Sequence, residues 1–212
     1  MLKKPKILTA ILLMSSTAAF ADNMLPYLGA EVGYDAGKWQ IKDATSVKTT
    51  PSATGGFGGL FAGLSWNLAP QFVLNTELFG NESSTSTSNQ TINIAGGGTS
   101  QAKMRMKYSY GVSLLPGFSF QNNAGMVYLR AGYIRSLFAW HQSIPPSTAK
   151  SNWGYTHVGG GQFGVGIQGN LGEAWGIRGE YDYVSYTTFT VFNNNITARD
   201  NQFKVGVLYN FH

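Results

Sequence analysis

The residues that could perform catalysis are few. The chain has three histidines, His141, His157 and His212, and no cysteine. Ser143 follows His141 closely, and a base beside a hydroxyl nucleophile is the pair that acyl transfer requires. No acid follows within about fifteen residues, so nothing nearby would orient the imidazole as a triad needs. We therefore predict no catalytic site, no metal site and no cofactor, and we do not expect an enzyme.

A basic run is the most distinctive local pattern. Lys103, Arg105 and Lys107 alternate with methionines, so in an extended strand they share one face. The residues that follow continue the same alternation. Its phase predicts that the basic face points to the inside of the fold, on a strand that extends beyond a membrane. Two interpretations stay open. The row could keep a protruding hairpin soluble, or it could bind an anionic partner such as lipopolysaccharide phosphate or a host polysaccharide. Arg135 could bind the same lipopolysaccharide headgroups.

Residues 1–21 have the pattern of a secretory signal peptide. Three lysines precede a short apolar run, and small residues close on an Ala-x-Ala end. Residues 22–212 are then expected to form a single domain with 12 Lys plus Arg against 10 Asp plus Glu. This near balance does not indicate a nucleic-acid partner. The absence of cysteine excludes a disulfide framework and, after this leader, a lipoprotein anchor.

Period-two alternation of apolar and polar residues recurs eight times and predicts strands. The expected strands cover 27–34, 56–67, 71–80, 102–118, 127–134, 161–170, 175–184 and 202–211. The connections alternate between long and short. The long ones, at 35–55, 81–101, 135–157 and 185–199, are expected to be loops. This alternation is typical of transmembrane barrels, which have short periplasmic turns and longer extracellular loops.

The sequence therefore predicts an all-β fold: a closed, eight-stranded antiparallel transmembrane barrel. Seven charged residues lie on the faces opposite the apolar ones, namely Glu31, Glu77, Arg130, Arg178, Glu180, Asp182 and Lys204. In a membrane barrel these face the lumen, and we expect one hydrogen-bonded plug in a filled core, with a gated ion path as the alternative. A soluble lipocalin-like barrel, with its apolar face inward, is the competing fold.

The last strand carries an apolar face made of alternate residues: Phe203, Val205, Val207, Tyr209 and Phe211. We expect this face to contact lipid and to be the C-terminal signal that the outer-membrane assembly machinery reads. Phe211 is then the anchor, and Lys204 falls on the lumen side.

Four stretches resemble the opacity-protein and OmpA/OmpX-type superfamily of eight-stranded outer-membrane barrels: 127–133, 163–167, 175–183 and 203–211. The resemblance covers essentially all of 22–212. It implies a lumen pair between a Glu on the third strand and an Arg on the seventh, for which Glu77 and Arg178 are suitably placed. The companion charges of that family are not matched, since Ser113 and Gln168 occupy their places.

The expected function is that of a surface-exposed structural or adhesion-type protein in the outer membrane, with both termini periplasmic. Its long loops would meet an extracellular or host ligand, and five aromatic residues are expected there: Trp39, Trp140, Trp153, Phe189 and Phe192. Outer-membrane lipid and lipopolysaccharide are the other expected partners. The alternatives are a narrow passive pore and a lipid A-modifying enzyme, because the His-x-Ser spacing is similar to that of lipid A deacylase barrels.

Overall fold

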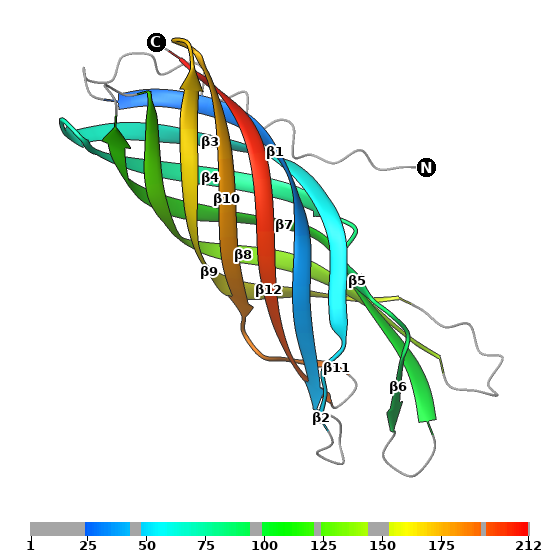
Figure 1. Cartoon of the computed structure of the whole chain (residues 1–212). Coiled ribbons are helices and arrows are strands. Elements are labelled where there is room, and N and C mark those ends of the chain that lie inside the picture. Colours follow the sequence, from blue (N-terminus) through cyan, green and yellow to red (C-terminus); the bar gives the residue numbers. More distant parts are fainter. Residues whose placement is uncertain are drawn as a thin grey trace.

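The computed structural model describes residues 24–42, 48–93, 99–120, 124–143, 153–191 and 194–211 (Figure 1). These residues form strands, turns and short irregular segments. No helix among them is long and apolar enough to cross a membrane. The predicted signal peptide lies outside the described residues.

Eight long strands form the barrel wall. They are β1 (Met24–Lys42), β3 (Ser52–Ala69), β4 (Phe72–Ser83), β7 (Thr99–Phe120), β8 (Gly125–Ser143), β9 (Gly154–Leu171), β10 (Trp175–Tyr186) and β12 (Asn194–Asn210). Four short strands extend the sheet at one end: β2 (Lys48–Thr49), β5 (Ser86–Thr87), β6 (Gln90–Asn93) and β11 (Phe189–Val191). Each long strand pairs antiparallel with the next, and β12 pairs with β1 from Asn210 opposite Tyr27 to Asn195 opposite Lys42. The ring is therefore closed, as predicted.

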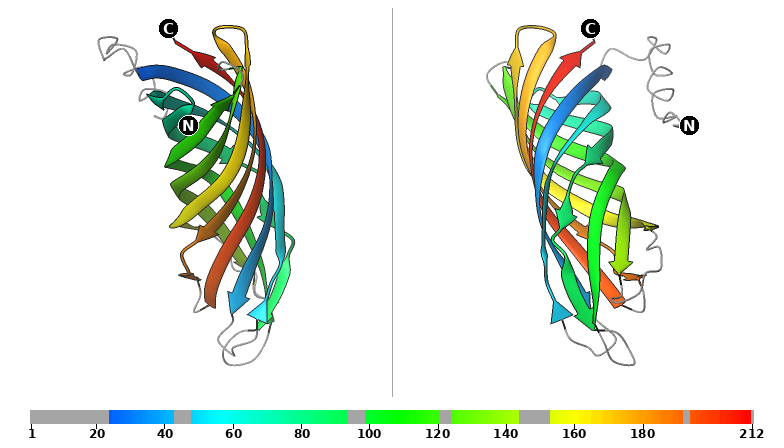
Figure 2. Two further views of the ribbon diagram at one scale, coloured as in Figure 1. Left: turned by 60° about the vertical axis from the view of Figure 1, so that its left-hand side comes forward. Right: turned by 90° about the vertical axis from the view of Figure 1, so that its right-hand side faces the viewer.

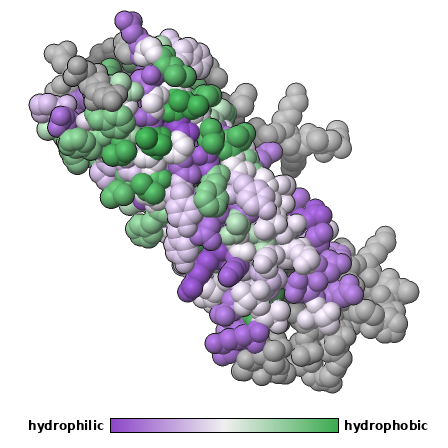
Figure 3. All heavy atoms as spheres, viewed as in Figure 1, coloured by the Kyte–Doolittle hydropathy of each residue, from purple (hydrophilic) through white to green (hydrophobic). Residues whose placement is uncertain are grey.

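The long strands tilt strongly about the barrel axis, and short turns gather at one end (Figure 2). The beginning of β1 and the end of β12 lie at that same end. Transmembrane barrels place their short turns on the periplasmic side. We therefore refer to the short-turn end as periplasmic and to the other end as extracellular. The words lower and below mean nearer to the periplasmic end, which is at the top in Figures 1 to 3, and upper and above mean nearer to the extracellular end.

The predicted strands lie within the long strands of the structure to within a residue, but the strands continue much further. Large parts of the four expected loops are strand, because β1 runs on to Lys42, β8 to Ser143, and β9 and β12 begin at Gly154 and Asn194. The expectation of four long loops is wrong to this extent. The wall instead continues as a sheet past the expected strands. We call this extracellular part the extension; it consists of β2, β5, β6 and β11 together with the extracellular ends of the long strands.

The predicted strands end too early because the alternation of apolar and polar residues changes faces along the real strands. In the lower part each long strand presents an exposed apolar residue to the outside: Val32, Leu60, Leu78, Val112, Leu129, Val165, Ile177 and Val205. In the extension the apolar residues face inward, as with Trp39 and Ile41, while Lys38, Gln40 and Lys42 are exposed. Figure 3 shows hydrophobic side chains gathered toward the short-turn end and hydrophilic ones toward the other end. Apolar residues that point inward, as in the competing soluble barrel, thus occur together with a polar outer face only in the extension.

A β-bulge in β7 carries this inversion. The pairing of β7 with β8 shifts between Met106 and Tyr108, so Lys107 is the additional residue. One inserted residue exchanges the two faces of a strand. Met104 and Met106 are consequently buried in the lumen, whereas Arg105 and Lys107 lie on the outer wall. The prediction that the basic row faces inward is wrong, because it extrapolated one phase through the bulge.

Candidate functional site

The lower lumen is filled by the seven charged residues singled out in the sequence, and all are buried. Glu77 lies between two arginines. Its Oε1 is 2.6 Å from Arg130 Nη2, and its Oε2 is 2.6 Å from Arg178 Nη1. Arg178 Nη2 also donates to Glu31 Oε2 at 3.0 Å. The pair implied by the resemblance, Glu77 with Arg178, is thus present as part of a larger network.

The second half of the network surrounds Lys204. This ammonium contacts the carboxylates of both Glu180 and Asp182. Arg130 joins the two halves, since its Nε lies 3.0 Å from Glu180 Oε1. With four acids and three bases, this group, which we call the charge plug, is close to neutral. Buried charges are tolerated where they are paired in this way.

Neutral groups complete the charge plug. Tyr27 donates its hydroxyl to Glu77 at 3.2 Å, and Tyr128 donates to Glu180 at 2.8 Å. The Arg178 guanidinium carbon is 3.5 Å from the ring centroid of Phe61. Such large rings fit a narrow barrel because glycines face them. A Cβ on Gly63 would collide with Tyr27, and one on Gly166 with Tyr128.

A second polar layer lies above the charge plug, and the sequence analysis missed it. Asp35 accepts hydrogen bonds from Thr85 Oγ1 at 2.6 Å and from Gln202 Nε2 at 2.8 Å. Asp200 accepts one from Trp39 Nε1 at 2.8 Å, while its Oδ2 has no hydrogen-bond partner among the described residues. Asp35 falls in the expected loop 35–55, and Asp200 lies between the expected loop 185–199 and the expected last strand. Only their alternation with outward polar residues, such as Lys38 and Arg199, could have revealed them.

Asp200 lies outside the membrane-spanning part, because its neighbours on the strand, Arg199 and Asn201, point outward and are polar. Burial raises the pKa of Asp200 to about 7, and the nearby Asp35 carboxylate adds to the rise. The hydrogen bond from Trp39 opposes it. This carboxyl group therefore titrates close to neutral pH.

An apolar cluster fills the extension above these aspartates. Its buried members in the extension include one large side chain from each of β1, β7, β8, β10 and β12: Trp39, Met106, Phe138, Tyr186 and Ile196. The rings of Trp39 and Phe138 meet edge to face at 5.2 Å, and Trp140 and Phe189 pack against the cluster. The expectation that Trp39 is available in a loop is wrong, because its side chain is fully buried. Trp153 is partly exposed, and the side chain of Phe192 lies outside the described residues.

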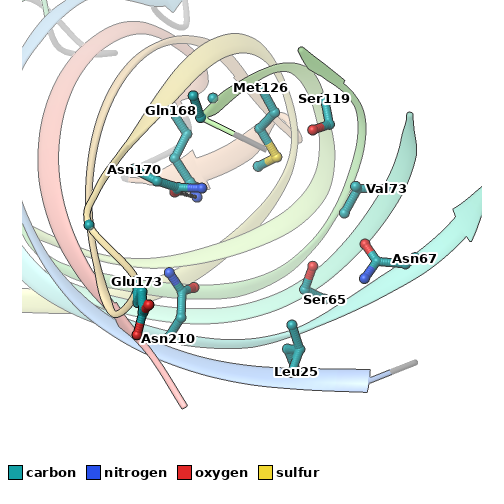
Figure 4. Close-up of a pocket in the computed structure, with 13 residues that line it drawn as sticks. Leu25, Ser65, Asn67, Val73, Ser119, Met126, Gln168, Asn170, Glu173 and Asn210 are labelled. Carbon is teal, nitrogen blue, oxygen red and sulfur yellow. Dashed lines mark hydrogen bonds between the residues drawn. The ribbon is translucent and has the colours of Figure 1, made fainter. Parts of the chain in front are cut away.

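The periplasmic mouth holds a cavity of about 620 Å³ below the charge plug. Figure 4 shows that Ser65, Asn67, Gln168, Asn170 and Asn210 line it together with the thioether of Met126. Leu115, Met126 and Tyr128 form a small buried cluster at this end of the lumen. The interior thus consists of a polar mouth, a charge plug, an aspartate layer and an apolar cluster.

The outer wall of β7, β8 and β9 carries basic and aromatic side chains above the apolar belt. The guanidinium carbon of Arg105 is 5.1 Å from the ring centroid of Trp153, and the His141 ring is also 5.1 Å from that ring. His141 and Ser143 lie on β8, and the side chain of Ser143 is not described. No group of three or more His, Cys, Asp or Glu among the described residues could hold a metal ion.

The alternate apolar residues of the last strand point outward. Phe203, Val205, Val207 and Phe211 are about half exposed and Tyr209 is 38% exposed, whereas Lys204 and Leu208 between them are buried. Tyr209 also contacts Trp175 edge to face at 5.2 Å on the neighbouring strand. These rings mark the periplasmic edge of the apolar belt, where aromatic side chains are favoured.

A closed ring with an apolar belt outside and paired charges inside defines an integral transmembrane β-barrel of the outer-membrane type. The chain belongs to the family described as outer membrane protein beta-barrel domain, whose sequence profile matches residues 7–211. It is accordingly a protein of the Gram-negative outer membrane. No curated protein sequence matches the chain.

The chain is similar to several solved outer-membrane proteins. Ail, the attachment invasion locus protein of Yersinia pestis, in complex with the heparin analogue sucrose octasulfate, is 13% identical, with 88% of this chain and 99% of Ail covered and a TM-score of 0.42. OprG of Pseudomonas aeruginosa is 14% identical, with 90% and 96% covered and a TM-score of 0.44. The protease OmpT of Escherichia coli is 10% identical, with 92% and 100% covered and a TM-score of 0.46. At these identities the likeness concerns the fold alone.

Proposed function

We propose that the protein is a sealed, surface-exposed barrel whose extension makes an adhesion-type contact with an anionic partner outside the cell. The observation that carries this proposal is the distribution of charged residues: most of the described acids lie in the lumen, and most of the described bases lie on the outer surface. Six of the acids are buried in the lumen: Glu31, Asp35, Glu77, Glu180, Asp182 and Asp200. The outer surface of the extension therefore retains few of them.

The described outer surface of the extension is strongly basic. Eight exposed or half-exposed bases lie on it, namely Lys38, Lys42, Lys48, Lys103, Arg105, Lys107, Arg135 and Arg199, against the single exposed acid Glu82. A surface of one sign attracts partners of the opposite sign and speeds their association. The row of Lys103, Arg105 and Lys107 is the best candidate contact within it, because Trp153 and His141 lie beside it and offer stacking surfaces.

The test is the binding of a sulfated polysaccharide to the purified barrel in neutral, lipid-free detergent micelles. We expect saturable binding that weakens as salt is raised, because exposed charges are screened. Replacing Lys103, Arg105 and Lys107 together by Gln should weaken binding more than replacing Lys38, Lys42 and Arg199, which removes the same charge from the opposite side. Absence of binding at low salt would rule out this partner class.

The filled lumen argues against the passive pore. Arg130, Arg178 and Lys204 occupy the lower lumen in ion pairs, and the apolar cluster fills the extension above them. The matching measurement is conductance in planar bilayers, where large stable channels from the wild-type protein would favour the pore. Analysis of lipid A acyl chains after incubation with the protein tests the enzyme alternative, and loss of such an activity in Ser143→Ala would favour it.

A further inference from the structure

Arg135 occupies an unusual place on the outer wall. It is exposed and lies directly opposite Tyr110 on β7 and opposite Gly159 on β9. No ion pair within the described part of the chain includes it. An exposed guanidinium without an acid partner keeps its five donors for a ligand.

Tyrosine residues lie next to Arg135 on its own strand, β8, and on the neighbouring strand β7. Tyr110 and Tyr133 are about half exposed, and a Cβ on Gly159 would collide with the Tyr133 hydroxyl, so the Tyr133 ring lies over the glycine opposite Arg135. Tyr108 stacks on Tyr110 at 6.5 Å and meets His157 at 6.1 Å. We call Arg135 with these three tyrosines the Arg135 frame.

The Arg135 frame lies at the upper edge of the apolar belt. Below Tyr110 on the same face come Val112 and Leu114, and below Tyr133 comes Leu129, all largely exposed. Aromatic rings at such an edge sit at the level of lipid headgroups. Basic side chains at this level recognise the phosphates of anionic lipids.

We propose that the Arg135 frame binds a phosphate of a phosphorylated glycolipid in the outer leaflet. Arg135 would donate to the phosphate in the bidentate manner that guanidinium groups favour. The hydroxyl groups and faces of Tyr108 and Tyr110 would contact the sugar, and the acyl chains would lie along Val112 and Leu129. Glu82, directly opposite Tyr108 on β4, would confine the anion to the β8 side.

This site does not depend on the extracellular contact proposed above, because it faces the membrane's own lipid. The test is native mass spectrometry of the barrel in neutral micelles with added lipid A. The probes are the diphosphorylated lipid, the same lipid without phosphate, and inorganic phosphate. We expect Arg135→Gln to weaken retention of the phosphorylated lipid by about tenfold or more.

Arg199→Gln is the matched control, since Arg199 is an exposed arginine on β12 outside the Arg135 frame. It should leave lipid retention unchanged. A second variant, Gly159→Val, should displace the Tyr133 ring and weaken retention while keeping the charge.

Three results would overturn the proposal: equal loss in both arginine variants, equal retention of the dephosphorylated lipid, or displacement of lipid A by inorganic phosphate at matched concentration. The polysaccharide assay contains no lipid A, so failure of either proposal leaves the other testable.

Discussion

At the residue scale, the barrel interior depends on a few side chains that bind several partners each. Arg178 is the clearest example, because it pairs with Glu31 and Glu77 and stacks on Phe61. Removing one partner from a buried ionic network leaves the others uncompensated in a medium that solvates them poorly.

Arg178→Ala should therefore destabilise the barrel by about 3 to 5 kcal/mol. The measurement is the temperature at which the folded band on an unboiled gel is lost. Arg199→Ala, which removes an exposed arginine, should leave that temperature nearly unchanged. We expect conductance in planar bilayers to rise little in Arg178→Ala, because the rings and the apolar cluster remain. A wild-type melting temperature for Arg178→Ala would show that the charge plug does not stabilise the fold.

Asp200 gives the extension a pH dependence. Its pKa is raised from 3.8 to about 7 in the folded state, so the folded protein binds this proton more tightly than the unfolded chain does. The stabilisation is fully present below about pH 4 and is lost as the pH rises toward 7. Asp200→Asn should remove this part of the pH dependence and raise stability at pH 8 relative to wild type.

Unfolding of wild type and Asp200→Asn at pH 4.5 and pH 8 measures the effect. Glu82→Gln, which changes an exposed carboxylate of the extension, is the control and should follow wild type. If Asp200→Asn keeps the full wild-type dependence, Asp200 is not the titrating group.

At the element scale, the strands show how far the sequence could predict the fold. Where the outer face of the barrel is apolar, the alternation of apolar and polar residues located all eight strands, because the lipid-facing residues of every spanning strand must be apolar. Above the belt the medium is water and the rule reverses, so Trp39 and Ile41 look like loop residues unless the reversal is known. The bulge at Lys107 could not be located either, because the alternation of apolar and polar residues runs from Met104 to Tyr110 without a change of phase in the sequence.

The bulge predicts which side chains of β7 water can reach. Because the protein has no cysteine, single cysteines can be labelled cleanly. Arg105→Cys and Lys107→Cys should react with a membrane-impermeant maleimide on intact cells, whereas Met106→Cys should be protected. The reverse pattern would show that the basic row faces the lumen.

The last strand predicts an effect on assembly. Phe211→Ala should lower the fraction of the protein that reaches the membrane as a folded, heat-modifiable species, because the apolar edge of this strand is the expected assembly signal. Phe72→Ala is the control, as Phe72 is an equally exposed aromatic on β4. Equal loss in the two variants would point to lost apolar contact rather than to a signal in the last strand.

At the scale of the whole molecule, the candidate site was only partly predictable. All seven charge-plug residues could be placed in the lumen, because a charge on the lipid-facing side of a spanning strand is costly. Asp35 and Asp200 were missed, because their positions depend on how far the sheet continues beyond the membrane. The basic row of Lys103, Arg105 and Lys107 was singled out, but it was predicted on the inner face. Arg135 was predicted to serve lipid headgroups, but the tyrosines beside it could not be predicted because they depend on the register of three strands.

Closure of the ring predicts a simple whole-molecule measurement. The protein should migrate differently on a denaturing gel before and after boiling, because a barrel without a sheet edge resists detergent until it is heated. A single unchanged band would contradict a closed barrel.

The sorting of charge has a consequence for transport across the periplasm. Without the predicted signal peptide, residues 22–212 would carry a net charge of only +2 as an unfolded chain, whereas the described outer surface of the extension exposes eight bases and one acid. The unfolded chain would therefore have little electrostatic attraction to polyanions while it crosses the periplasm. If the proposed adhesion surface binds polyanions, its affinity for them would arise only when the barrel closes and buries its acids.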